Sequence, residues 1–237
     1  MIDATARARQ AVEAWLRLDA DDPACNDARD VVAALGREAL ERAAGATSGS
    51  GSTRAFDRAL AGAMADLREQ LGELEVGDDD ERSMFARFVA KVPGVGSPAE
   101  RHARRLASAR PRIESMVTSI ESERAVLMRD NVTMRADLDR LHEIESELLT
   151  VIGDVQAYED ALEFAVDVEV PELDPRRTLF EDELLGGVRH RRSELERSRV
   201  TNHAGIETLE SAMDANRAVI REIDTLSRTA SNRLETR

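Results

Sequence analysis

The residues best suited to acid–base or metal chemistry are scattered along the 237-residue chain. None of the four histidines, His102, His142, His190 and His203, has another histidine or a cysteine three or four residues away. That spacing would place two metal ligands on one face of a helix. Cys25 is the single cysteine, so it can form neither an intrachain disulfide nor a cysteine-rich metal site. We therefore predict a non-enzymatic protein with no catalytic residues, no metal and no cofactor.

Two acidic pairs have the spacing of a weak divalent-cation site. Glu143 and Glu147 are four residues apart, as are Glu159 and Glu163, so each pair shares a helical face. Carboxylates at this spacing are more often a solvated helix surface than a metal site. We interpret them as solvated surface and keep direct metal binding as an alternative.

Two arginine clusters stand out against an acidic background. The first follows a Pro-Gly loop and contains Arg101, Arg104 and Arg105. Guanidinium groups at this density could face an anionic partner, such as a lipid headgroup, a polyanion or an oxyanion. Pairing with acidic residues of another helix is the favoured alternative, because few apolar or aromatic residues flank the cluster to anchor it in a membrane. The second cluster spans residues 189–199.

The composition restricts both the fold and the partners. Only 3% of the residues are aromatic and 34% are charged, so the chain lacks the large side chains that fill sandwich and barrel interiors. Its surplus of Ala, Leu, Arg and Glu favours an all-α fold. A net charge of −14 opposes general nucleic-acid binding, which depends on Lys and Arg neutralising phosphates.

The sequence also bears on the compartment. It contains no run of 18 apolar residues, and its first ten residues lack the apolar segment of a signal peptide. A lone cysteine suits a reducing compartment. We expect a cytoplasmic protein whose association with the inner face of a membrane, where it occurs, is peripheral or through a partner.

Glycines, prolines and capping residues divide the chain into two regions. Residues 1–84 are expected to form a smaller, variable helical region. Asp3 and the Asp22-Pro23 pair mark the first two helix starts. Residues 45–53 have the Gly/Ser composition of a flexible linker. The predicted helices of this part of the chain span residues 3–20, 23–44, 54–74 and 83–91.

A long helix is predicted to open the second region, residues 85–237. Ser97 and Glu100 give the pattern of a capping box, with Pro98 at the first helical position. From there to residue 168, apolar side chains recur at every seventh position, and such a sustained period specifies a supercoil with a partner helix. The eight positions are Ile113, Ile120, Leu127, Met134, Leu141, Leu148, Val155 and Leu162.

The partner helix is predicted to follow a bend near residues 169–177, which contain two prolines. Folding back there places residue j opposite roughly residue 345 minus j, as in an antiparallel helix pair. The arginines of the 189–199 cluster then face positions 146–156, within a stretch, residues 141–167, of eight acids and no Lys or Arg. A second apolar seam continues in steps of three and four through Ile206, Leu209, Met213, Asn216, Ile220, Ile223, Ser227, Ala230 and Leu234. The sequence thus predicts a long antiparallel helical hairpin, or coiled coil.

Two asparagines lie at or beside the seam positions of the two long helices. Asn131 belongs to the first helix and Asn216 to the second. A polar residue in a coiled-coil seam can fix the register at some cost in stability. We expect this role for both asparagines rather than catalysis.

Several segments of the second region resemble the TelA-type toxic anion (tellurite) resistance proteins. The resemblance rests on Phe88-Val-Ala-Lys91-Val-Pro-Gly-Val-Gly96, on Ser108-Ala-Arg-Pro-Arg-Ile-Glu-Ser-Met-Val117 and on Leu127-Met-Arg-Asp-Asn131. It continues in Met213-Asp-Ala-Asn216 and the Thr-containing run after it. Residues 85–237 are covered, and Asp130, Asn131 and Asn216 occupy motif positions. The resemblance implies these three are register or interface residues.

The same resemblance implies resistance to tellurite, related toxic anions or envelope stress in a bacterial cell. We therefore expect a helical scaffold near the membrane that binds protein partners, or a second copy of itself, through its helical seams. Two alternatives stay open. One is a cytoplasmic coiled-coil adaptor of another process, and the other is a direct anion- or metal-binding protein.

Overall fold

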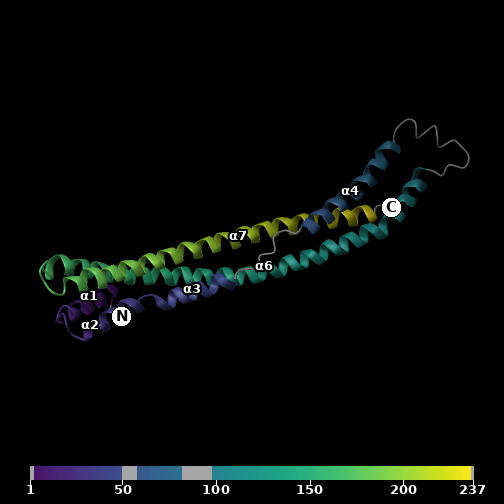
Figure 1. Cartoon of the computed structure of the whole chain (residues 1–237). Helices are drawn as coiled ribbons and strands as arrows, with labels where there is room; N and C mark the ends of the chain where they lie inside the picture. Colours follow the sequence, from purple (N-terminus) through teal and green to yellow (C-terminus); the bar gives the residue numbers. More distant parts are fainter. Residues whose placement is uncertain (1–2, 50–57, 82–97, 236–237) are drawn as a thin grey trace, which may run out of the picture. The chain divides into compact units, whose positions relative to one another are not determined.

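The computed structural model describes residues 3–49, 58–81 and 98–235 (Figure 1). Within these ranges every regular element is helical, and no strand occurs. The predicted all-α fold with a long antiparallel hairpin is therefore confirmed. The elements are α1 (Ala4–Trp15), α2 (Ala24–Ala34), α3 (Arg37–Gly49), α4 (Arg58–Glu81), α6 (Pro98–Phe164), η1 (Ala165–Glu169), η2 (Leu179–Leu185) and α7 (Gly186–Glu235).

The start of the long helix agrees with the sequence, and α6 begins at Pro98. It continues through the exposed Pro111 without ending. All eight side chains of the predicted seven-residue repeat are buried, none more than 7% exposed. The helix predicted over residues 83–91 and the capping residue Ser97 lie outside the described residues.

The N-terminal helices differ from the prediction in their bounds. The first ends at Trp15 rather than at residue 20, and Asp3 precedes it without a side-chain cap bond. Asp22 does accept a hydrogen bond, from the Ala24 backbone N–H at 2.8 Å, as its position before a proline predicted. The helix predicted over residues 23–44 is two helices, because Gly36 adopts a left-handed φ of 69° between them.

The predicted linker and the helix after it also need correction. α3 continues to Gly49, so the first five residues of the proposed Gly/Ser linker are helical. Residues 50–53 lie outside the described part of the chain. α4 extends to Glu81 rather than ending at residue 74. Ala and Thr among the glycines and serines of residues 45–49 allow the helix to propagate from α3, where composition alone favoured a linker.

The chain separates into two compact units that do not follow the predicted division at residue 84. Unit 1 comprises Met1–Ser52 and Ala136–Glu210, and unit 2 comprises Thr53–Arg135 and Ser211–Arg237. Each unit therefore contains one part of α6, one part of α7 and at least one N-terminal helix. The reason is that the N-terminal helices have apolar faces, which they bury against the hairpin rather than against one another alone.

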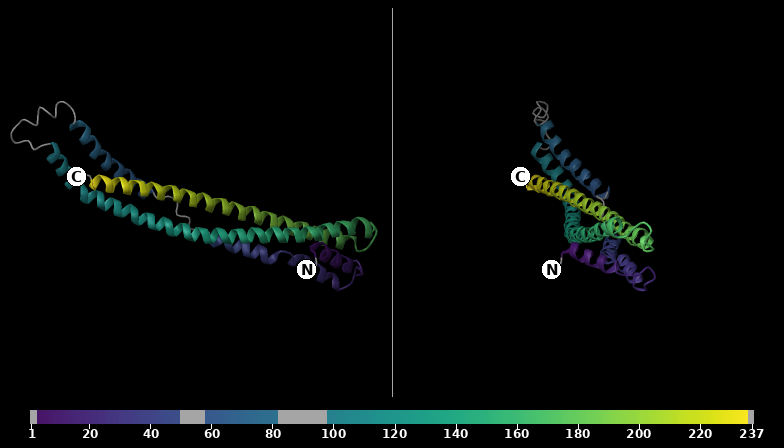
Figure 2. Two further views of the ribbon diagram at one scale, coloured as in Figure 1. Left: turned by 180° about the vertical axis from the view of Figure 1, so that it is seen from behind. Right: turned by 90° about the vertical axis from the view of Figure 1, so that its left-hand side faces the viewer.

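In unit 1, α1, α2 and α3 pack on the parts of α6 and α7 next to the bend (Figures 1 and 2). Trp15 of α1 stacks on Tyr158 of α6, with ring centroids 6.1 Å apart. Val32 of α2 belongs to the same core, together with Leu148 of α6 and Leu195 of α7. Each fully buried side chain of this size contributes about 1.5–3 kcal/mol. The interior of unit 1 is thus filled by side chains from α1, α2, α3, α6 and α7 and from η1 and η2.

In unit 2, α4 supplies a third helix to the pair formed by α6 and α7. Its buried residues Leu60, Met64, Leu67 and Leu71 recur in steps of four and three, the spacing of one helical face. They form one core with the seam positions of the two long helices. Arg68 of α4 also pairs with Glu222 of α7. The seam that the sequence assigned to two helices is therefore shared by three in this unit.

Candidate functional site

The polar contacts within the hairpin seam lie where the two long helices meet. In unit 2, Asn216 Nδ2 donates a hydrogen bond to Asn131 Oδ1 at 3.1 Å. Asn216 is buried and Asn131 is half-buried, as is the neighbouring Asp130. The two asparagines predicted to lie in the seam are thus brought into contact with each other. Each amide can meet its partner in only a few alignments of the helices, which is the property that a register residue needs.

A second buried asparagine, Asn202, was missed by the sequence analysis. Its Nδ2 donates to the Leu141 backbone O and to Glu145 Oε2, both at 3.0 Å, and the side chain is fully buried in unit 1. Its Oδ1 accepts no hydrogen bond from the described residues. Continuing the α7 seam towards the N-terminal end of the helix at seven-residue intervals leads to Asn202. The spacing Val188, Leu195, Asn202, Leu209, Asn216, Ile223 and Ala230 is unbroken, and all seven side chains are buried.

Arginines of α7 pair with acids of α6 in unit 1, as the charge pattern predicted. Arg199 Nε lies 2.8 Å from Glu145, and Arg192 Nη1 lies 2.8 Å from Glu159. Arg189 reaches both Glu159, at 3.3 Å, and Glu163, at 2.6 Å. Glu159 is only 5% exposed, so its charge requires these partners.

The predicted register holds near residue 145 and drifts towards the bend. Arg199 faces Glu145, beside the expected position 146, whereas Arg189 faces Glu159 and Glu163 rather than position 156. The π-helical turns η1 and η2 lie between the bend and both pairs, so the difference comes from the length of the Arg189 side chain, which reaches acids nearer the bend than the residue opposite its backbone. Arg191 and Arg197 bind elsewhere: Arg191 donates to the Ala33 backbone O of α2 at 2.7 Å, and Arg197 donates to Ser193 at 3.0 Å.

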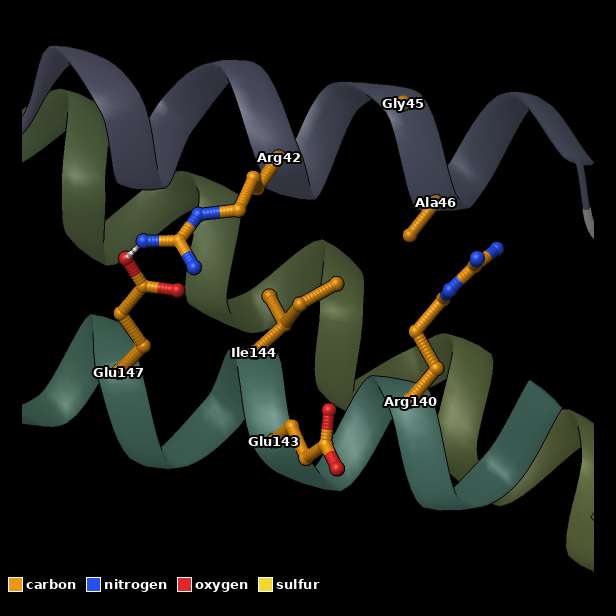
Figure 3. A pocket seen from close by; sticks show the side chains of 7 residues that line it. All are labelled: Arg42, Gly45, Ala46, Arg140, Glu143, Ile144 and Glu147. Carbon is orange, nitrogen blue, oxygen red and sulfur yellow. Dashed lines mark hydrogen bonds and ion pairs between the residues drawn. The ribbon is translucent and has the colours of Figure 1, made fainter. Parts of the chain in front are cut away.

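Three of the four acids considered as weak cation sites pair with arginines. Glu147 pairs with Arg42 of α3, whereas Glu143 points away from that contact (Figure 3). Glu159 and Glu163 both bind Arg189. Among the residues that the structure describes, no group of three or more His, Cys, Asp or Glu side chains is arranged to hold a metal ion. The interpretation as solvated surface holds for the exposed Glu143 and is corrected to interhelical ion pairing for Glu147, Glu159 and Glu163.

A groove in unit 1 lies between α3 and α6 and has a volume of about 400 Å³ (Figure 3). Ile144 forms its floor, and the small residues Gly45 and Ala46 leave it open on the α3 side. Arg42 and Arg140 lie at its two ends. Because Glu143 and Glu147 also line it, the groove carries both signs of charge and does not select an anion by charge.

A second groove, of about 690 Å³, lies on α6 and α7 in unit 2. Arg124 Nε lies 2.6 Å from Asp224 there, so these two charges neutralise each other. The remaining lining residues are Glu121, Ser227 and Arg228.

The three arginines proposed to face an anion lie in the first two turns of α6. Arg104 and Arg105 are exposed, whereas the side chain of Arg101 lies outside the described part of the structure. A separation of 27 residues along one helix places Arg104 about 40 Å from Asn131. The arginines and the asparagines therefore do not form one site, and the anion-facing role stays a prediction.

The bend of the hairpin is held by two arginines. Arg177 Nη1 donates to the backbone oxygens of Val166 and Val170, at 2.7 and 2.8 Å, and so caps the end of η1. Asp174 Oδ1 accepts the Arg176 backbone N–H at 2.8 Å, and its carboxylate also pairs with the Arg176 guanidinium at 2.8 Å. Arg176 Nη1 in turn donates to the backbone oxygens of Leu16 and Leu18. The predicted bend near residues 169–177 is confirmed.

This arrangement predicts a pH-dependent stability. Hydrogen bonds from Arg176 lower the pKa of Asp174 from its ordinary 3.8 to about 2. A carboxyl group with a lowered folded-state pKa stabilises the folded protein above its unfolded pKa, and that stability is lost as the pH falls from about 4 to about 2. We expect Asp174→Asn to lower the melting temperature at pH 7 and to flatten its fall between pH 4 and pH 2. Thermal unfolding followed by circular dichroism measures both. An unchanged acid profile in this variant would contradict the assignment.

Comparison with protein-family models, with curated proteins and with solved structures finds no match to this chain. The resemblance to TelA-type proteins therefore stays a prediction from the residues alone. None of the described helices has an apolar stretch long enough to cross a lipid bilayer.

Proposed function

We propose that this protein is a non-enzymatic helical scaffold that holds partner proteins. The observation that carries the proposal is a buried polar contact between α6 and α7 in each unit. Asn216 contacts Asn131 in unit 2, and Asn202 contacts Leu141 and Glu145 in unit 1, where Arg199 also pairs with Glu145. Buried polar residues cost stability and are best explained where one alignment of helices must be selected. A scaffold needs one defined alignment of its helices, because a partner contacts side chains of neighbouring helices at the same time.

In its more specific form, the scaffold acts in resistance to toxic anions such as tellurite, or to envelope stress. The support is the set of TelA-like segments around Asn131 and Asn216, which coincide with the contact between these two side chains. Deleting the gene in its native host should reduce growth on tellurite or on envelope-targeting antibiotics. A plasmid copy should restore it. Unchanged tolerance to all of these agents would remove the resistance role and leave the scaffold role to be judged by its partners.

The scaffold role and the place near the membrane are tested together. Light scattering of the purified protein gives its oligomeric state, and sedimentation of cell extracts shows whether it travels with membranes. We expect a fraction with the membranes that high salt releases, as peripheral or partner-mediated attachment would give. Partners recovered by crosslinking in cells should be lost from Asn202→Asp, in which the helix pairing is disturbed. Recovery of the same partners at the same yield would contradict a scaffold that depends on the register.

A direct anion-binding role is the main competing function, favoured by the exposed Arg104 and Arg105. Calorimetric titration with tellurite, phosphate, calcium and manganese distinguishes it. The scaffold proposal expects no heat of binding. A saturable heat with tellurite or phosphate that Arg104→Glu with Arg105→Glu abolishes would contradict the proposal and favour the binder.

A further inference from the structure

Exposed apolar side chains gather near the bend of the hairpin in unit 1. Leu173 is 97% exposed, Val168 is 66% exposed and Phe164 is 58% exposed. Val168 follows Phe164 by four residues at the junction of α6 and η1, so the two share a face. A single exposed apolar residue needs no explanation, but an aromatic and two aliphatic side chains within ten residues of a bend mark a contact surface. We call Phe164, Val168 and Leu173 the hairpin-end surface.

The backbone that carries the hairpin-end surface is held by defined contacts. Val166 and Val170 are buried between its exposed members, and Arg177 binds the backbone oxygens of both. The Val170 N–H donates to the Ala165 O at 2.9 Å, and Asp174 closes the following turn. Because the backbone of this surface is already held in place, less conformational entropy is lost when a partner binds. π-helical turns, as in η1 and η2, are also rare and recur at functional sites.

The charges around this surface indicate what it binds. Asp167, Glu169 and Glu172 are exposed. No side chain in the described part of the protein forms an ion pair with any of these three acids, because the nearby Arg176 and Arg177 bind Asp174 and Glu181. Asp19 of the adjacent α1–α2 loop adds to this negative field at Arg176. An acidic rim repels anionic lipid headgroups and attracts Lys and Arg.

We propose that the hairpin-end surface docks a basic, amphipathic segment of a partner protein. Apolar side chains of that segment would cover Phe164, Val168 and Leu173, and its basic side chains would face the acidic rim of Asp167, Glu169 and Glu172. The inference rests on the proposed scaffold function and specifies where a partner is held and by what chemistry. Apolar anchors within a charged rim are the usual anatomy of such an interface.

Binding of a defined probe to the full chain tests the proposal. The probe is a synthetic 18-residue amphipathic helix with a leucine face and a lysine face, and its counterpart carries glutamate in place of lysine. We expect the lysine peptide alone to bind, with an affinity that falls as salt is added. The triple variant Phe164→Ser, Val168→Ser, Leu173→Ser should weaken binding by about tenfold or more, since central apolar anchors dominate such interfaces. Fluorescence anisotropy measures the affinity.

Two further variants separate the surface from the overall charge of the chain. The matched control replaces Val132 and Val200 by serine, because these residues are 73% and 71% exposed but lie far along the sequence from the bend. It should bind the peptide as the wild type does. Asp167→Asn with Glu169→Gln and Glu172→Gln should weaken binding by about fivefold and reduce its salt dependence. Unchanged circular dichroism in each variant shows that the fold is kept.

Several results would overturn the proposal. Equal peptide affinity of the wild type and the apolar triple variant would show binding to the acidic chain in general. Binding to phosphatidylglycerol vesicles that the triple variant loses would identify a membrane, and self-association that it loses would identify a second copy of the chain. Each of these outcomes leaves the scaffold proposal intact, because that proposal is judged by the partners recovered in cells.

Discussion

Replacing Gly36 by alanine is expected to destabilise unit 1 by about 2–5 kcal/mol. Gly36 has a φ of 69°, and an added Cβ would lie 2.9 Å from Leu195 Cδ1 and 3.0 Å from Val151 Cγ1. The left-handed backbone alone costs an alanine about 1–2 kcal/mol. Overpacking against the fully buried Leu195 adds about 1–3 kcal/mol. Urea unfolding at pH 7 measures the change in the free energy of unfolding.

Gly153→Ala is the matched control for this prediction. Gly153 lies within α6 in the same unit, and an added Cβ would meet nothing within 4 Å. The same chemical change should therefore stabilise the protein by about 0.5–1 kcal/mol, because alanine loses less backbone entropy in a helix. A Gly36→Ala variant as stable as the wild type would contradict both the left-handed backbone and the close contact at this position.

Replacing Asn202 by aspartate is expected to cost about 3–5 kcal/mol. The change puts a second carboxylate beside Glu145 Oε2 and removes the donor that serves both Glu145 and the Leu141 backbone O. A buried charge without a partner is costly to this extent. Asn202→Leu should cost less than the aspartate variant by at least about 2 kcal/mol, because leucine fills the seam position without an unsatisfied polar atom. Thermal unfolding and urea unfolding at pH 7 rank the three proteins.

Asn26→Asp provides the control for the aspartate variant. Asn26 is exposed in the first turn of α2, and its Oδ1 already accepts a hydrogen bond from Arg29 at 2.8 Å. A carboxylate there gains an ion pair and a favourable interaction with the helix dipole, so stability should stay the same or rise slightly. Raising the pH from 4 to 7 should destabilise Asn202→Asp relative to the wild type, since the buried carboxyl then ionises. Absence of this pH effect would place residue 202 outside the buried seam.

The two asparagines that the sequence places at or beside the seam contact each other in the structure. Asn131 Oδ1 lies 3.1 Å from Asn216 Nδ2. The structure adds Asn202, which occupies the same face two heptads earlier. An asparagine in the seam of each unit indicates that the register is specified separately in both.

The seven-residue repeat by itself determined that the chain forms two long helices with buried faces. That pattern is local: residues seven apart lie on one side of a helix whatever the rest of the chain does, and burying eight such side chains requires a neighbour. The two prolines near residue 172 and the acid and arginine blocks then fixed the bend and the antiparallel direction. The repeat, the prolines and the charge blocks can all be seen in the sequence without knowledge of the tertiary packing, so the long helices, the bend and their direction could be predicted.

The tertiary structure alone decided what covers the hairpin and which polar atoms meet. α4 and the apolar faces of α1–α3 pack on the long helices. The sequence of the segments that connect these helices does not indicate where on the hairpin each of them packs. The contact of Gly36 with Leu195, the two acceptors of Asn202 and the exposure of Phe164 each depend on residues far apart in sequence. Such contacts follow from the packing of several helices at once, and helical periodicity gives the face of a helix but not its partner.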